Sequence, residues 1–218
     1  MASLVQDVWL GWEPRLRGRR LAPWDEPAVR LVFHIDAGAT LDEPKVASFL
    51  DSAARQLEVI AWEPRGQGGS AGRLGPELLD DARRLVADLP RRWGGDLPVV
   101  VGGHGLGAWL ALAVAEAPGV TGALAFAPTL AAAASPNPPS LGTAIAGALA
   151  RPPLDVPTLI VEGRERAPAD AAAVADWLAR QPRASRLVVP GGDASAFGPP
   201  WTLAATAWAA AVGKAARG

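Results

Sequence analysis

The chain of 218 residues contains no cysteine and no tyrosine, and it has only two histidines, His34 and His104. Without cysteine there are no disulfides, no thiolate catalysis and no sulfur ligands for a metal. Acid–base chemistry therefore depends on carboxylates, the two imidazoles, lysine or water. We expect neither a metal site nor a cofactor.

Long apolar runs and excess charge are also missing. No apolar stretch approaches the about 18 residues of a membrane span, and the N-terminal residues lack a basic segment followed by an apolar one. The formal net charge is -1 and basic residues are mixed with acidic ones, so no electrostatic footprint for nucleic acid or an anionic membrane is visible. We expect a soluble, cytoplasmic protein that binds neither nucleic acid nor membranes.

What the chain does contain is an alternation of apolar strands and amphipathic helices. Half of its residues are hydrophobic, enough for one sizeable core, and the length fits a single domain over 1–218. Residues 7–24 read as an antiparallel hairpin. Strands are then predicted at 28–35, 58–65, 97–103, 119–128, 157–163 and 185–192, and helices at 41–56, 76–93, from 106, 169–181 and 200–216. Apolar strands separated by helices predict an α/β fold with a mostly parallel sheet covered on both faces.

One segment interrupts this regular order. Residues 129–153 combine a proline cluster with a short apolar helix. Two interpretations stay open, a loop followed by a surface helix or a short lid over a ligand pocket.

Three segments at predicted strand ends carry a family resemblance. They are "VFHIDAG" (32–38), "WEPRGQGGSAG" (62–72) and "GGHGLGAWLAL" (102–112). In this order they resemble the oxyanion loop, the Arg-Gly-x-Gly-x-Ser turn and the nucleophile elbow of the α/β-hydrolase fold family. The resemblance implies an eight-stranded, mostly parallel sheet with an N-terminal antiparallel hairpin, helices on both faces and a short or minimal lid.

The same resemblance implies that the catalytic triad is vacant. The elbow carries Gly105 where the family has its nucleophile, Arg166 stands at the acid position, and Ala194 stands at the histidine position. A relocated nucleophile would have to be Ser70 or Ser195, the serines of the motif loops, within reach of a histidine.

Backbone features of the elbow are expected to survive. Gly105 leaves room for a substrate and tolerates a strained turn, and the helix that starts near Leu106 directs its free N–H groups at the pocket. By resemblance, the oxyanion donors are the N–H groups of Leu106 and of a residue near Ile35 or Asp36.

Four polar side chains are candidate catalytic groups: Asp36, Asp193, His34 and His104. Asp36 is either a turn aspartate facing solvent or a general acid–base group whose pKa is raised by burial. Asp193 either ties the last loop or borders the vacated histidine position. By resemblance, His34 and His104 correspond to residues that are mostly structural.

Pocket walls are predicted at Trp62, which ends its strand at the ligand edge of the sheet, and at Arg166, which is read either as an exposed loop charge or as a group that binds a substrate carboxylate. Trp109, Trp201 and Trp208 are expected to pack in the core. An aromatic pocket wall would suit an apolar or aromatic small molecule.

Three functions follow, in order of preference. The first is a non-hydrolytic enzyme, a lyase, cyclase, isomerase or dehydratase, that uses the retained oxyanion-type pocket. The second is a catalytically silent pseudohydrolase that binds a small ligand or a partner protein. The third is an esterase or thioesterase with a relocated nucleophile. A nicotinamide site is disfavoured, because the loose Gly-x-Gly-x-x-Ala pattern of residues 103–108 is not followed by an acidic strand end. Homodimerisation stays open.

Overall fold

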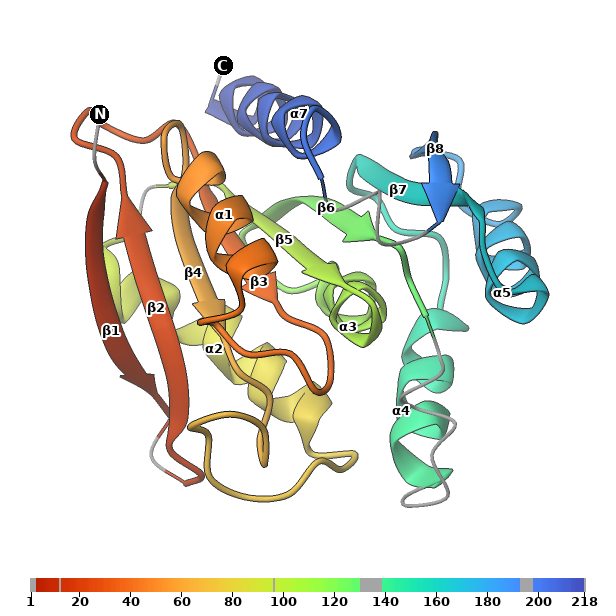
Figure 1. The fold of residues 1–218 in the computed structure, drawn as a ribbon, viewed down its shortest axis with the longest axis horizontal. Helices are drawn as coiled ribbons and strands as arrows, with labels where there is room; N and C mark the ends of the chain where they lie inside the picture. The colour runs from red at the N-terminus through yellow and green to blue at the C-terminus, as the bar shows by residue number, and fades with distance from the viewer. Residues whose placement is uncertain (1–2, 12, 96, 130–138, 193–197, 218) are drawn as a thin grey trace.

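The computed structural model describes residues 3–11, 13–95, 97–129, 139–192 and 198–217 (Figure 1). Its strands are β1 (Leu4–Leu10), β2 (Leu16–Ala22), β3 (Arg30–His34), β4 (Glu58–Trp62), β5 (Val99–His104), β6 (Val120–Phe126), β7 (Thr158–Glu165) and β8 (Ala184–Gly192). Its helices are α1 (Pro44–Ala53), α2 (Leu78–Trp93), α3 (Leu106–Val114), α4 (Pro139–Leu149), α5 (Pro168–Leu178) and α7 (Trp201–Arg217).

All eight strands form one sheet in the order β1-β2-β4-β3-β5-β6-β7-β8. The hairpin of β1 and β2 is antiparallel and joins β4 in antiparallel fashion, whereas β4, β3, β5, β6, β7 and β8 run parallel. The expected α/β-hydrolase architecture, including its N-terminal hairpin, is confirmed.

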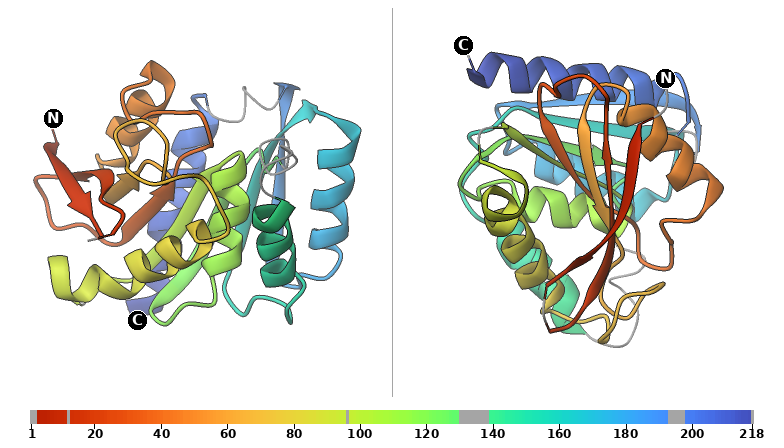
Figure 2. Two further views of the ribbon diagram at one scale, coloured as in Figure 1. Left: turned by 90° about the horizontal axis from the view of Figure 1, so that it is seen from below. Right: turned by 90° about the vertical axis from the view of Figure 1, so that its left-hand side faces the viewer.

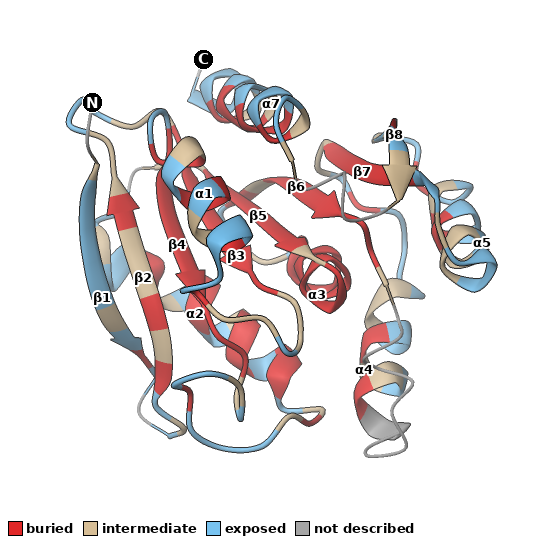
Figure 3. Cartoon of the chain, viewed as in Figure 1, coloured by how far each residue is buried: buried red, intermediate tan, exposed pale blue. Residues whose placement is uncertain are grey.

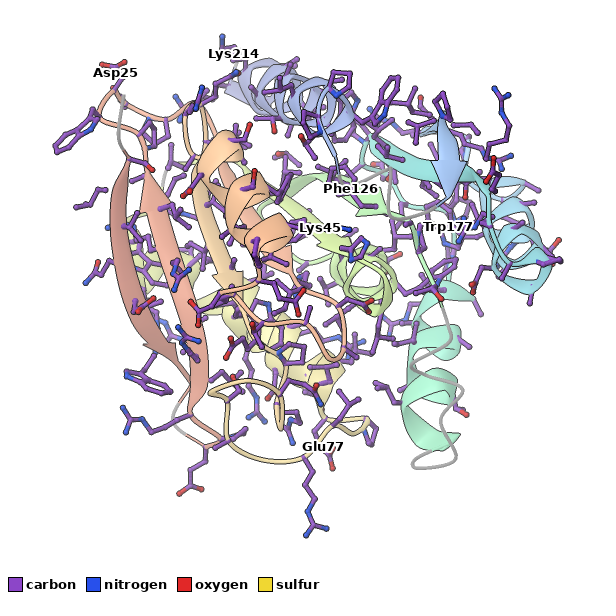
Figure 4. All side chains as sticks on the ribbon, viewed as in Figure 1. Asp25, Lys45, Glu77, Phe126, Trp177 and Lys214 are labelled. Atoms are coloured by element: carbon purple, nitrogen blue, oxygen red, sulfur yellow. The ribbon has the colours of Figure 1, made fainter. Side chains whose placement is uncertain are left out.

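Two apolar layers sandwich the sheet (Figures 1 and 2). Residues of α1 and α7 pack on one face, and residues of α2, α3, α4 and α5 pack on the other. The central strands are buried on both faces, while β1 and β8 at the two edges are largely accessible (Figure 3). Phe126 lies within the first layer, and Asp25, Glu77 and Lys214 project into solvent (Figure 4).

The segment predicted as a loop followed by a surface helix, or as a short lid, contains the helix α4. Within 129–153, α4 places Leu141 and Ile145 in the core against α2 and α3. Residues 130–138 lie outside the described part of the chain, so the lid interpretation stays a prediction. Among the described residues, no helix is long and apolar enough to cross a bilayer.

Candidate functional site

The turn between β5 and α3 forms the centre of the site. Gly105 has φ 60° and ψ -122°, a conformation in the positive-φ region that glycine adopts at little cost. The flanking glycines permit close packing: a Cβ on Gly103 would lie 2.1 Å from the carbonyl oxygen of Gly107, and a Cβ on Gly107 would lie 2.1 Å from that of His34. The glycines therefore seat the first turn of α3 directly on the ends of β5 and β3.

The carboxylate of Asp36 occupies this turn. Its Oδ1 accepts one hydrogen bond from the Leu106 N–H at 2.7 Å and another from the Ala37 N–H at 2.8 Å. These are the residue that follows the elbow position and a residue of the loop after β3, where the resemblance placed the two oxyanion donors. Both donors are thus present, and both bind an oxygen of the chain itself.

The carboxylate also fills the space over Gly105. A Cβ added to Gly105 would lie 2.2 Å from Cγ and from Oδ2 of Asp36, and 2.4 Å from Oδ1. Such contacts are far shorter than any van der Waals distance. The Asp36 carboxyl therefore lies in the space beside Gly105 where we expected room for a substrate.

The two oxygens of Asp36 have different environments. While Oδ1 accepts two backbone N–H groups, Oδ2 has no hydrogen-bond partner among the described residues. Burial raises the pKa of Asp36 above its ordinary value, against the opposing effects of the Leu106 hydrogen bond and of the His104 imidazole, and the charge of Glu43 adds to the increase. Asp36 as a whole residue is partly exposed, and among the described residues only its Oδ1 is held by hydrogen bonds.

His34 and Trp62, in contrast, belong to the core. Trp62 Nε1 donates to His34 Nδ1 at 2.7 Å, and both residues are 1% exposed. Burial lowers the pKa of His34 from 6.5 to about 3, so the imidazole stays neutral with its proton on Nε2. The structure thus places both side chains in the interior, Trp62 in the same apolar cluster as Trp109, and the catalytic role of His34 and the pocket-wall role of Trp62 stay predictions.

Arg166 is not an exposed loop charge. Its side chain is 2% exposed and donates to the Glu162 carboxylate and to the Pro128 carbonyl, and Arg186 donates to the same carboxylate. Glu162 is a fully buried residue of β7. The Arg166 guanidinium is engaged in this buried ion pair and is not available to bind a substrate carboxylate.

Ser70 has a structural role as well. Its hydroxyl donates to the Glu63 carbonyl oxygen and accepts the Arg17 N–H, each at 2.8 Å, and the residue is buried. These contacts hold the loop after β4 against β2. Ser70 is therefore not placed as a relocated nucleophile.

The remaining predicted residues divide into two groups. Ile35 is 1% exposed and packs with α1 and α7, and the second N–H donor to Asp36 is that of Ala37, the residue directly after Asp36. Trp109 packs in the core, as expected. Asp193, Ala194 and Ser195 lie outside the described residues, and their predicted roles stay predictions.

Sequence reasoning missed two polar residues in the loop after β4, Gln67 and Glu63, that bind neighbouring segments. Gln67 Oε1 accepts the Gly38 N–H at 2.9 Å, which connects the loop after β4 to the loop that carries Asp36. Glu63, fully buried, accepts the N–H groups of Leu41 and Gly69 and pairs with Arg17. A glutamate directly after an apolar strand was the available signal for such a loop anchor. Across the described residues, no cluster of three or more histidine, aspartate or glutamate side chains could hold a metal.

The parallel sheet, the glycine turn and the helix that starts directly after it define a protein of the α/β-hydrolase fold. Residues 46–189 match the family described as serine aminopeptidase, S33, and the chain belongs to this family.

Solved structures with the same fold are similar along nearly their whole length. An α/β serine hydrolase homologue from Coxiella burnetii is 17% identical with a TM-score of 0.69, covering 94% of this chain and 96% of that one. An esterase from Pyrococcus furiosus is 15% identical with a TM-score of 0.73, covering 99% and 92%. Est1E from Butyrivibrio proteoclasticus is 10% identical with a TM-score of 0.75, covering 94% and 98%. At these identities the likeness shows the fold alone. No curated protein sequence matches the chain.

Proposed function

We propose that this protein is a non-hydrolytic enzyme, a lyase, cyclase, isomerase or dehydratase, in which Asp36 moves a proton on a small molecule. One observation carries the proposal. The Asp36 carboxyl stands over Gly105 with Oδ1 fixed by two backbone N–H groups and Oδ2 without a partner among the described residues. A positioned carboxyl with one uncommitted oxygen is suited to general acid–base catalysis.

The electrostatics of the site support the same role. Burial raises the pKa of Asp36 above its ordinary value, which makes the carboxyl a stronger base than an exposed aspartate. His104 is the titratable neighbour whose charge acts on Asp36 in the opposite direction. In this proposal Asp36 takes a proton from one atom of the substrate and returns it to another atom or to a leaving hydroxyl group, and His104 tunes its pKa.

Ester hydrolysis at this turn fits the geometry poorly. Residue 105 has no hydroxyl group, and the two N–H groups that would hold an acyl oxygen already bind Asp36 Oδ1. An acyl group at the turn would also overlap the Asp36 carboxylate. These contacts favour chemistry in which Asp36 itself meets the substrate.

A silent pseudohydrolase is the second candidate, and one observation favours it. Because both N–H donors are satisfied within the chain, the turn is stable without a ligand and offers no vacant oxyanion site. In this case the protein would bind a small ligand or a partner protein without converting it.

Metabolite conversion separates the candidates. A small-molecule extract of the source organism is incubated with wild-type protein, Asp36→Asn and the control Asp42→Asn, and the products are found by untargeted mass spectrometry. Asp42 is an exposed aspartate paired with Arg17 and Arg19, so its replacement tests the loss of a carboxylate elsewhere. We expect wild type and Asp42→Asn to form an isomer or a dehydrated product and Asp36→Asn to form neither.

Three outcomes would contradict the proposal. Equal conversion by Asp36→Asn would remove Asp36 from the chemistry. Cleavage to an acid and an alcohol, with labelling by a fluorophosphonate, would indicate a serine hydrolase with its nucleophile elsewhere. No conversion by the wild type would favour the silent binder.

A further inference from the structure

The contact between Asp36 and the turn reverses the polarity that the fold presents to a ligand. Two N–H groups at the start of α3 and in the loop after β3 would offer hydrogen bonds to a ligand oxygen. Here Asp36 Oδ1 accepts both bonds, at 2.7 and 2.8 Å. A ligand that approaches Gly105 therefore meets a carboxylate oxygen, an acceptor, in place of two donors.

The charges around the turn act in the same sense. The charge of Glu43 raises the pKa of Asp36, and the His104 imidazole acts on it in the opposite direction. Arg166, which the sequence suggested as a cation for the pocket, is buried in its pair with Glu162. Among the described residues, His104 and Glu43 are the charged side chains that act most on the pKa of Asp36. The field at Oδ2 thus favours a cation or a strong hydrogen-bond donor.

The hydrogen-bonding capacity of Asp36 is only half used. A carboxylate offers about four acceptor sites, and the described contacts of Asp36 all involve Oδ1. Burial disfavours the charged form, so a donor on the ligand would recover free energy that burial costs.

We propose that the Asp36 site binds the protonated amine of a small ligand, where fold relatives would hold a carbonyl oxygen over the same turn. The ammonium group donates to Asp36 Oδ2 while Leu106 and Ala37 keep Oδ1 in place. The inference rests on the proposed function in one respect, the use of Asp36 as the group that faces the ligand, and it does not depend on turnover.

Three probes of the same shape test this inference: benzylamine, benzyl alcohol and benzoate. Their dissociation constants are measured at pH 7 and low ionic strength by NMR titration or calorimetry. Wild type and the control Asp42→Asn are expected to prefer benzylamine over the other two probes. Asp36→Asn, which keeps an oxygen for Leu106 and Ala37 but loses the charge, is expected to weaken benzylamine binding about tenfold or more.

A second variant makes the test directional. Asp36→Ala frees the N–H groups of Leu106 and Ala37, so its preference is expected to switch to benzoate. Circular dichroism and the thermal midpoint of unfolding show whether Asp36→Ala is folded. If it is not folded, the benzylamine affinity of the isosteric Asp36→Asn variant tests the inference.

Failure of this inference is distinguishable from failure of the proposed function. Three results would overturn the amine site. The wild-type protein does not bind benzylamine, it prefers benzoate, or it binds benzylamine no more tightly than Asp36→Asn does. If an uncharged metabolite is converted in an Asp36-dependent way by a protein without amine preference, the proposed function stands and this inference falls. If amines bind through Asp36 and no metabolite is converted, this inference stands and the proposed function falls.

Discussion

Asp36 Oδ1 lies 2.7 Å from the backbone nitrogen of Leu106, a residue seventy positions further along the chain. The contact caps the N-terminus of α3 with a carboxylate from the loop after β3. Negative charge is favoured at a helix N-terminus, and caps of this kind contribute about 1 kcal/mol. The same bond occupies a donor that the fold would direct at an acyl oxygen, so a stabilising contact and a functional constraint coincide in one pair of residues.

Restoring a serine at the turn is expected to fail. Gly105→Ser places a Cβ 2.2 Å from the Asp36 carboxyl at a positive φ, so we expect a loss of at least about 2 kcal/mol in the free energy of unfolding, measured with urea, and no esterase activity.

Gly119→Ser is the matched control for that substitution. Gly119 also has a positive φ, 85°, but a Cβ there meets nothing within 4 Å, so its cost of about 1 kcal/mol reports backbone strain alone. The double variant Asp36→Ala/Gly105→Ser should recover stability relative to Gly105→Ser. Two results would contradict the clash between the serine introduced by Gly105→Ser and Asp36. The two serine variants lose the same free energy of unfolding, or the loss in the double variant equals the sum of the losses in the two single variants.

His34 makes stability depend on pH. Its pKa is about 3 in the folded protein and 6.5 in the unfolded chain, so between these values the unfolded chain binds the extra proton. The contribution is fully present above pH 6.5 and is lost as the pH falls toward 3, by a few kcal/mol. Asp36, whose pKa is raised, contributes with the opposite sign.

Replacement of His34 by asparagine isolates the contribution of the His34 imidazole to the pH dependence of stability. The amide oxygen can accept from Trp62 Nε1 in place of Nδ1, and the group no longer titrates. Urea unfolding of both proteins at several pH values should show a smaller rise in stability between pH 3 and 6.5 for His34→Asn. Parallel curves would mean that His34 is accessible to protons in the folded state.

Arg166 is expected to matter for stability. Among the described residues, Arg166→Met leaves the buried Glu162 carboxylate with Arg186 as its cationic partner, and the loss of one partner of a buried ion pair costs about 3 kcal/mol or more. Arg164, exposed on the same strand, provides the control, since Arg164→Met should change the free energy of unfolding by less than about 0.5 kcal/mol. A similar small change for Arg166→Met would contradict the buried pair.

The order of elements and the sheet were predictable because their signals are local. Apolar strands, amphipathic helices and the glycine turn at residues 102–107 are each visible within a short window of sequence. The donor at Leu106 followed from the same turn. The buried position of Trp109 followed from its place in the first turn of an apolar helix.

The contacts between side chains of distant segments were not predictable in this way. Asp36 fills the turn only because the close packing of α3 on β3 brings the two loops together. Trp62 meets His34 because the two residues are directly opposite in the parallel register of β3 and β4, which the sequence does not state. For Arg166 a signal did exist: Glu162 directly follows the apolar run Leu159–Val161 inside β7, and a buried carboxylate requires a cation.

Titration of the Asp36 carboxyl carbon by NMR, together with the backbone amides of Leu106 and Ala37, tests the central claim most directly. We predict a pKa above the ordinary 3.8 of aspartate, with both amide proton signals shifting at that same pH because their acceptor becomes protonated. In Asp36→Asn the two amide shifts should disappear. A pKa at or below 3.8, with amides that do not respond, would place Asp36 in solvent and contradict its position in the turn.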